Sequence, residues 1–279
     1  MIILCDMKRV VLYIIVLLLS VQCFAQGASQ RKNLIVTDTV VDKAKFRLYS
    51  FEFESAEFSK KVYFLLPLIE DTAVRHIIWD NMIGSQYDSK TLEQDLQDEI
   101  NMYMDRVASN PELIDAEKMD ERYSDYEYYE SSWRVTPLFV SDGYIALVEY
   151  ISEYNGGAIH HQWGEVAYVF SLSTGKQISQ EDILDDIGEH RDLVARKLYS
   201  LLKKYLNEED DGDQAEVSMM LNDNFYFTDK ELIYMYVPYE VTYYAAGEPT
   251  LSLPKKWLKP YLNVDGPLYK YWFGDKKTK

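Results

Sequence analysis

The sequence predicts an α+β protein with mainly antiparallel sheets, a few packed helices and two subdomains. Short alternating or apolar segments, typical of strands, outnumber the helical segments, and no regular βαβ alternation joins them. Of the 279 residues, 47% are hydrophobic, which is enough to build one large core or two ordinary ones. The sequence contains no internal repeat of fixed period.

Residues 1–25 have the pattern of a secretory signal peptide. Lys8-Arg9 precedes the apolar run 10–19, and the small-residue exit ends at Ala25, so we expect cleavage near Ala25. The run is short for a membrane span, and no second long apolar segment follows it. We therefore expect a periplasmic or secreted protein with no stable membrane span after cleavage. Translation could start at Met1 or at Met7.

The two cysteines, Cys5 and Cys23, both lie within this segment. A lipoprotein with Cys23 as the lipid-attachment residue is the less favoured alternative, because residues 20–22 lack the usual leucine and the usual small residue before the cysteine. The mature chain would have no disulfide in an oxidising compartment. Its core alone must then stabilise it.

Residues 34–154 are expected to form an N-terminal α+β subdomain. Residues 45–55 alternate as a strand with one buried face, and the apolar run 61–69 is a second strand. A helix is predicted over about 90–108 from its apolar face. Two further strands follow at 133–140 and 144–154, and Asp142-Gly143 is a hairpin turn signal between them.

Residues 155–263 are expected to form a C-terminal α+β domain, followed by a polar tail at 264–279. Residues 165–172 read as a strand, a helix is predicted over about 189–206, and 224–241 read as two strands joined by a turn. The residues predicted to be buried on the two long helices are Leu92, Leu96, Ile100, Leu198, Leu201 and Leu202.

The charge balance is strongly acidic, with 46 Asp and Glu against 29 Lys and Arg and a formal net charge of −17. Such a surface repels phosphate backbones, and we see no basic stripe that would offset it, so nucleic acid is not an expected partner. The same charge would attract a cationic partner. The 24 tyrosines suit strands and binding surfaces equally well.

A series of motifs runs in a fixed order through the second half of the chain. The series is Gly156-Gly157-Ala158 followed by a His, Thr174-Gly175-Lys176, Phe225 to Thr228, Ala245-Ala246-Gly247 and Trp257 to Leu262. It resembles a family of extracytoplasmic domains of unknown function, known from the C-terminal region of the lysozyme-sensing anti-sigma factor RsiV. The same family occurs in the non-catalytic N-terminal region of the peptidoglycan deacetylase PdaC.

The resemblance covers residues 155–263, and residues 34–154 resemble the smaller domain that usually precedes this one. It implies a binding or sensing role at the cell envelope, with lysozyme or the cell wall as the partner. One departure concerns the loop that runs Gly-Gly-Ala-His-Gly in the family. Here Ile159 separates Ala158 from His160, so the loop is one residue longer than the family pattern or is shifted relative to it.

His160 and His161 are the best candidates for chemistry. Adjacent residues on a strand point to opposite faces, so the pair does not easily ligate one metal, and neither His76 nor His190 has a sequence context that makes it a third ligand. There is no GxSxG motif and no phosphate-binding glycine loop. We expect no metal, no cofactor and no catalytic residue, with the histidines in a structural or binding loop.

These observations predict a secreted cell-envelope protein that acts as a non-catalytic binding or sensor-type module. Its expected partner is a basic protein such as lysozyme or a peptidoglycan-type glycan. The alternative is a hydrolase of envelope glycans or peptides that uses His160, His161 and Glu165. The binding surface is expected where the loop 155–163 approaches the segment 239–247, as an aromatic patch with an acidic rim. Its predicted residues are Gly156, Gly157, His160, His161, Trp163, Tyr239, Tyr243 and Tyr244.

Overall fold

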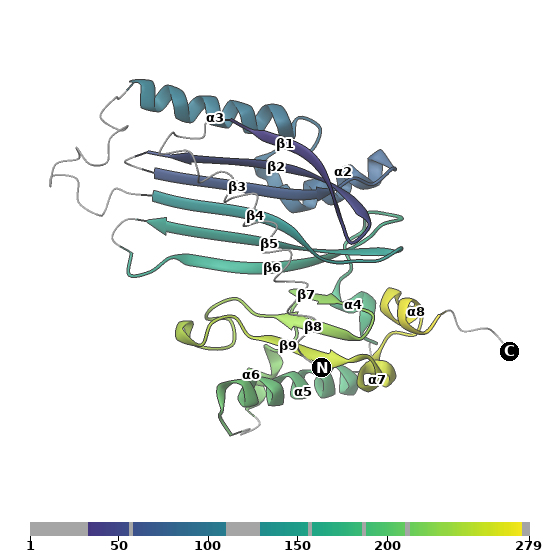
Figure 1. Cartoon of the computed structure of the whole chain (residues 1–279). Coiled ribbons are helices and arrows are strands. Elements are labelled where there is room, and N and C mark those ends of the chain that lie inside the picture. Colours follow the sequence, from purple (N-terminus) through teal and green to yellow (C-terminus); the bar gives the residue numbers. More distant parts are fainter. Residues whose placement is uncertain are drawn as a thin grey trace. The chain divides into compact units, whose positions relative to one another are not determined.

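Two sheets organise the chain in the computed structural model (Figure 1). The structure describes residues 33–55, 58–109, 129–155, 158–185, 188–209 and 213–274, and these all fall in one compact unit that begins at Lys32. The predicted signal peptide and the pair Gly156-Gly157 lie outside the described residues. The α+β class with mainly antiparallel sheets is confirmed.

The first sheet has six strands arranged in chain order. Residues such as Phe51 and Phe53 are buried at every second position, as the alternation predicts. Every neighbouring pair is antiparallel except β3 and β4, which are parallel. The bounds are β1 (Ile35–Val41), β2 (Ala44–Glu54), β3 (Phe58–Pro67), β4 (Tyr129–Val140), β5 (Tyr144–Asn155) and β6 (Gln162–Ser171).

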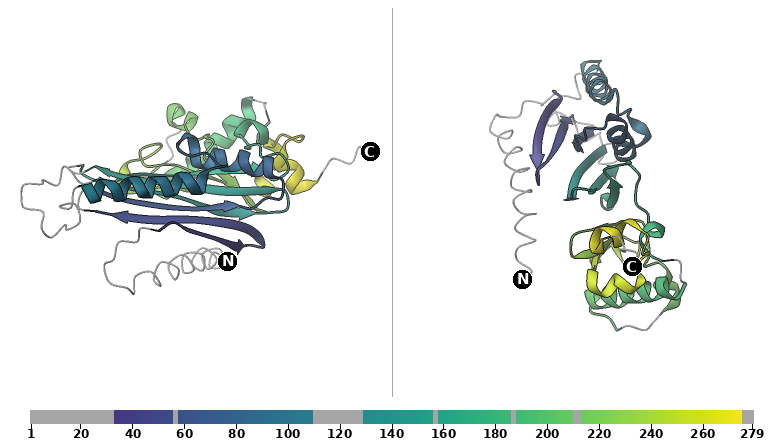
Figure 2. Two further views of the ribbon diagram at one scale, coloured as in Figure 1. Left: turned by 90° about the horizontal axis from the view of Figure 1, so that it is seen from above. Right: turned by 90° about the vertical axis from the view of Figure 1, so that its right-hand side faces the viewer.

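The parallel pair requires a long crossover, because the chain must return to the same end of the sheet. The crossover contains α2 (Thr72–Ile83), the short η1 (Gly84–Gln86) and α3 (Leu92–Ser109), and both long helices lie on one face of the sheet (Figure 2). The helix expected at 90–108 is confirmed as α3. The helix α2 was not predicted.

The α2 helix begins at a cap that the sequence supplies locally. The Asp71 side chain accepts hydrogen bonds from the backbone N–H groups of Ala73 and Val74, at 2.9 and 3.1 Å. Val74, Ile78 and Met82 repeat at four-residue spacing and are buried against the sheet. Ile77 lies outside this buried stripe and is 44% exposed. An apolar residue at an exposed position obscures the helical pattern in the sequence.

The second sheet has three antiparallel strands, β7 (Phe225–Phe227), β8 (Glu231–Met235) and β9 (Thr250–Pro254). The helix expected at 189–206 is confirmed as α5 (Gly188–Leu206) and packs in the core of this region. The remaining elements are α4 (Gln180–Ile183), α6 (Gln214–Ser218), η4 (Tyr244–Ala246), α7 (Lys255–Leu258), η5 (Lys259–Tyr261) and α8 (Pro267–Phe273).

Five of the six predicted core residues are buried, and Leu201 is the exception. Leu201 is only half-buried and packs at the margin of the core that contains Leu198 and Leu202. Since helical positions advance by 100° per residue, Leu201 lies at the edge of the stripe that these neighbours define.

The structure corrects the predicted organisation in two places. β6 pairs with β5 as a hairpin, so the first sheet runs through the expected boundary between residues 154 and 155 and ends at Ser171. The expected polar tail, 264–279, contains α8, in which Leu268 and Trp272 are buried. Trp272 Nε1 also donates to the carbonyl of Thr228 at 2.7 Å, which ties α8 to the β7–β8 turn.

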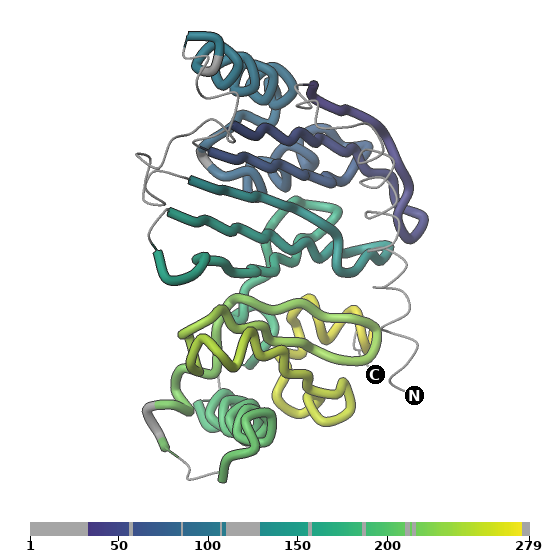
Figure 3. Tube along the Cα trace, turned by 60° about the vertical axis from the view of Figure 1, so that its left-hand side comes forward, coloured from purple at the N-terminus to yellow at the C-terminus, as the bar shows by residue number. Residues whose placement is uncertain are grey.

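The outer edge of β6 is joined to the second sheet region by side chains. The amide of Asn224 accepts from the N–H of Ala167 at 2.7 Å and donates to the carbonyl of Glu165 at 2.8 Å. The Glu248 carboxylate accepts from the N–H of Glu165 at 3.1 Å. Figure 3 shows β6 bordering the strands of the second sheet. These side chains provide hydrogen-bond partners for three backbone groups at the edge of β6, where a seventh strand would otherwise pair.

None of the helices in the described ranges is long and apolar enough to cross a membrane.

Candidate functional site

The floor of the candidate site comes from the pairing of β5 with β6. Tyr150 lies opposite Glu165, and Ser152 lies opposite Trp163. Side chains directly opposite each other in an antiparallel pair project from the same face. Ala146 and Val148 share this face and pack in the core that contains α5 and the second sheet. The floor therefore lies on the face away from α2 and α3.

The opposite wall comes from the chain between β8 and β9. The Glu240 carboxylate accepts from the N–H of Val237 at 3.0 Å and from the Asn222 amide at 2.7 Å, which closes a tight turn. This turn holds Tyr239 at a φ of 69°, in the left-handed region that bulky residues rarely adopt. Tyr244, at the start of η4, completes the wall.

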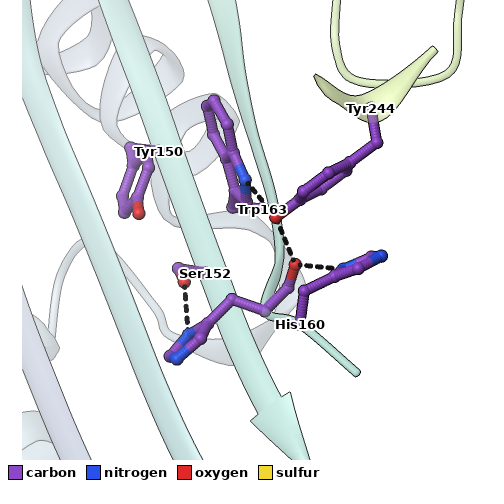
Figure 4. A pocket seen from close by; sticks show the side chains of 6 residues that line it. Tyr150, Ser152, His160, Trp163 and Tyr244 are labelled. Carbon is purple, nitrogen blue, oxygen red and sulfur yellow. Dashed lines mark hydrogen bonds between the residues drawn. The ribbon is translucent and has the colours of Figure 1, made fainter. Parts of the chain in front are cut away.

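The two segments meet through rings and hydrogen bonds, as we expected (Figure 4). The His160 ring stacks on Tyr244 with centroids 3.9 Å apart and planes 18° apart. Trp163 Nε1 donates to the Tyr244 hydroxyl at 3.1 Å, and this hydroxyl donates to the His161 carbonyl at 3.2 Å. His160 Nδ1 donates to the same carbonyl at 3.0 Å. One carbonyl therefore fixes both rings of the stack.

These residues surround an open depression of about 400 Å³, which we call the aromatic groove. Its size is within the usual range for small-molecule sites, and most of its lining is aromatic or imidazole. The residues that line it are Tyr150, Ser152, His160, His161, Trp163 and Tyr244.

The two histidines have separate surroundings. The His161 ring stacks on Tyr154 with centroids 4.8 Å apart, and its Nδ1 lies 3.4 Å from the Ser152 hydroxyl. His160 instead contacts Tyr244 and lies 3.5 Å, through Nε2, from the Tyr239 hydroxyl. In the ranges that the structure describes, no group of three or more His, Cys, Asp or Glu residues could hold a metal ion.

Charged groups stand beside the groove on the same face of the sheet. The Arg134 guanidinium lies 4.5 Å from the centroid of the Tyr150 ring and reaches Glu165 at 3.4 Å. Burial, and then the nearby Glu165 carboxylate, raise the pKa of Glu248 to about 7. The margin therefore combines two carboxylates with one cation, whereas the sequence suggested an acidic rim alone.

The structure divides the eight predicted site residues into three groups. His160, His161, Trp163 and Tyr244 line the groove, and Tyr239 stands at its margin with 64% of its surface exposed. Tyr243 is 59% exposed and does not line the groove. Gly156 and Gly157 lie outside the described residues.

Sequence reasoning missed four groups at this site. Tyr150 and Ser152 follow from the strand alternation of β5, but only once its partner and register are known. Arg134 comes from β4 and Glu248 from the loop before β9, and no sequence motif connects either residue to the histidines.

Comparisons with known proteins support the fold and leave the function open. Residues 177–256 match the family described as a protein of unknown function, DUF3298. A crystal structure of a member of the DUF3298 family from Bacteroides fragilis superimposes with a TM-score of 0.63 at 14% identity. That superposition covers 88% of this chain and 100% of the other.

A DUF3298 family protein from Pseudomonas aeruginosa gives a TM-score of 0.47 at 10% identity, covering 84% of this chain and 94% of the other. A comparison with curated proteins finds no match. Residues 177–256 are thus similar to a DUF3298 domain, and the described fold is similar to that of the Bacteroides fragilis protein.

Proposed function

We propose that this chain is a non-catalytic binding module of the cell envelope, and that its aromatic groove holds a peptidoglycan-type glycan. The observation that carries the proposal is the open groove, which is lined by the rings of Tyr150, Trp163 and Tyr244. Aromatic faces supply contact area for the apolar faces of sugar rings, while hydroxyl groups such as that of Ser152 supply hydrogen bonds.

A location outside the cytoplasm is part of this proposal. It rests on residues 1–25, whose basic start, apolar run and small-residue exit have the signal-peptide pattern. A glycan of the envelope would then be accessible to the groove. A sensor role is compatible with the same site, since a sensor must also bind its ligand before it passes the signal to a partner.

The contacts of the polar groups favour binding over catalysis. His160 and His161 are held by different aromatic partners, and Glu165 is paired with Arg134. Among the described residues no hydrogen bond joins either imidazole to Glu165. Proton transfer requires the acid and the base to lie within hydrogen-bond reach of the reacting group. A fixed wall of rings serves a binding role more directly.

A basic protein such as lysozyme is the second candidate ligand. The net charge of −17 favours it, because this field would attract a cationic partner over a long range. Glu165 and Glu248 beside the groove would place negative charge at the contact itself.

The test is calorimetric titration of the chain lacking residues 1–25 with soluble disaccharide-peptide fragments of peptidoglycan. We expect saturable binding that Trp163→Ala weakens by about fivefold or more, because an aromatic ring contact is worth about 1 kcal/mol or more. Tyr129→Ala is the matched control, since Tyr129 is a half-exposed ring on the opposite face of the same sheet.

Lysozyme titrated at low and high salt separates the two ligands. If lysozyme binds and the peptidoglycan fragments do not, and if salt weakens that binding, the ligand of the groove is a basic protein. Cleavage of the fragments by the purified protein, abolished in His160→Ala, would overturn the non-catalytic proposal.

A further inference from the structure

A second surface with the opposite charge lies near the C-terminal end of the described chain. Residues 255–274 contain four lysines, a single aspartate and six aromatic residues, in a chain whose net charge is −17. The lysines are spread along the sequence, so they form no basic stripe there. The fold brings Lys255 and Lys259 to Phe273 of α8, and Lys256 and Lys270 lie on the same elements, α7 and α8.

Helical geometry places the charges on one side of each element. Lys255, Lys256 and Lys259 fall within about 100° of one another on the continuous turn of α7 and η5. On α8 the same spacing groups Lys270 with two rings, those of Tyr269 and Phe273. We call these six residues the lysine–aromatic patch.

Phe273 joins the two groups. The Lys259 ammonium lies 4.6 Å from the centroid of its ring, and the Lys255 ammonium lies 4.9 Å from it. Tyr269 extends the aromatic surface, with its ring centroid 5.1 Å from that of Phe273. Two lysines four residues apart on a helix repel each other, so this arrangement concentrates positive charge that a bound anion would stabilise.

The patch is also not neutralised by the protein. Of the described lysines outside the patch, Lys60, Lys61, Lys176 and Lys203 lie within 4.0 Å of a carboxylate, whereas others, such as Lys45 and Lys204, do not. In the described part of the chain, none of the four patch lysines forms such a pair, although Asp and Glu outnumber Lys and Arg overall. Their charge is therefore directed at solvent or at a partner.

The patch lies away from the aromatic groove. The loop that carries Tyr244 enters β9 at one end, and α7 leaves β9 at the other. Figure 1 shows α7 and α8 on the right-hand side of the second sheet, whereas the loop between β8 and β9 is on the left. A partner on the patch would leave the groove uncovered.

We propose that the lysine–aromatic patch docks this protein on an anionic lipid membrane. The ammonium groups would contact the phosphodiester headgroups, and the rings of Tyr269 and Phe273 would lie at the level of the headgroups, where aromatic side chains are favoured. The remaining acidic surface is repelled by the same membrane, so only this end of the protein faces it. The proposal is independent of the ligand that the groove binds.

The test is flotation of the chain lacking residues 1–25 with vesicles of phosphatidylglycerol and phosphatidylcholine. That deletion is necessary because the apolar run 10–19 would itself enter the bilayer, and every described residue belongs to a unit that begins at Lys32. We expect binding that requires phosphatidylglycerol and that decreases between 0.05 and 0.5 M salt, values on the order of those that change the Debye length severalfold.

Lys256→Glu combined with Lys259→Glu should reduce vesicle binding by about twentyfold or more, since each lysine near a charged membrane contributes about fivefold. The control combines Lys45→Glu with Lys204→Glu, two exposed lysines on β2 and α5 that give the same change in net charge. We expect the control to bind as the unmodified chain does.

Three outcomes would overturn the proposal. They are absence of binding to phosphatidylglycerol vesicles, equal loss in the control and patch variants, and binding of the unmodified chain to pure phosphatidylcholine at the same level. Saturable binding of glycerol phosphate in solution, lost in the patch variant without any vesicle binding, would instead assign a small-anion site.

Discussion

The side-chain junction between β6 and Asn224 yields a quantitative prediction. Asn224 is 8% exposed, and its amide is the partner of two backbone groups, the N–H of Ala167 and the carbonyl of Glu165. The change Asn224→Ala removes both partners and leaves no atom in their place. A buried backbone group without a partner costs about 1–3 kcal/mol, so we expect the free energy of unfolding to decrease by about 2–5 kcal/mol.

The measurement is urea denaturation at equilibrium, followed by far-ultraviolet circular dichroism. Asn101→Ala is the control, because Asn101 is an exposed residue of α3 whose side chain accepts a hydrogen bond from half-buried Gln97 on the same helix. We expect the control to change the free energy of unfolding by less than about 0.5 kcal/mol. If Asn224→Ala were as mild as the control, the side-chain junction would not hold the β6 edge as we describe.

Three further changes have defined outcomes. Leu198→Ala should lower the free energy of unfolding by about 2–5 kcal/mol, and Leu201→Ala by less than half of that, as measured by urea denaturation. Tyr244→Phe should cost about 1 kcal/mol in the same assay, because the hydroxyl that bridges Trp163 Nε1 and a carbonyl is lost while the ring stack remains. Since the folded pKa of Glu248 is raised from 4.5 to about 7, the folded state binds this proton more tightly than the unfolded state does. The stability of the unmodified chain relative to Glu248→Gln should therefore decrease as pH rises from about 4.5 to about 7, and a difference that does not change with pH would contradict the assignment.

Much of the fold follows from local patterns in the sequence. The alternation through Phe51 and Phe53 predicts β2, and the apolar faces of α3 and α5 predict two long helices that the structure confirms. These elements are readable because each buries one face at a regular period. The α2 helix escapes the same reasoning because Ile77 adds an apolar residue on its exposed side.

The organisation of the chain is less accessible from local patterns. The resemblance of residues 155–263 to a known domain predicts a boundary between residues 154 and 155, yet β5 and β6 pair with each other as strands of one sheet. In α8, the charged and aromatic residues conceal Leu268 and Trp272, whose spacing of four residues marks its buried side. Both errors arise because the partner of a segment is decided by tertiary packing.

The candidate site shows the same division. The sequence identifies the loop with His160 and the segment with Tyr244, and the structure brings them into contact. The sequence alone cannot assign Arg134 or Tyr150 to the site, because the positions of these residues depend on the register between β4 and β5. Nor does any local signal distinguish Tyr244, whose ring lines the groove, from its exposed neighbour Tyr243.

The most direct test of the glycan-binding groove follows the indole N–H of Trp163 by nuclear magnetic resonance. The chain has five tryptophans, and Trp163→Phe identifies the signal of this one. Since this proton is donated to Tyr244 inside the groove, titration with disaccharide-peptide fragments of peptidoglycan should shift its signal saturably and leave the other four in place. An unchanged Trp163 signal at fragment concentrations that bind the protein would contradict the account.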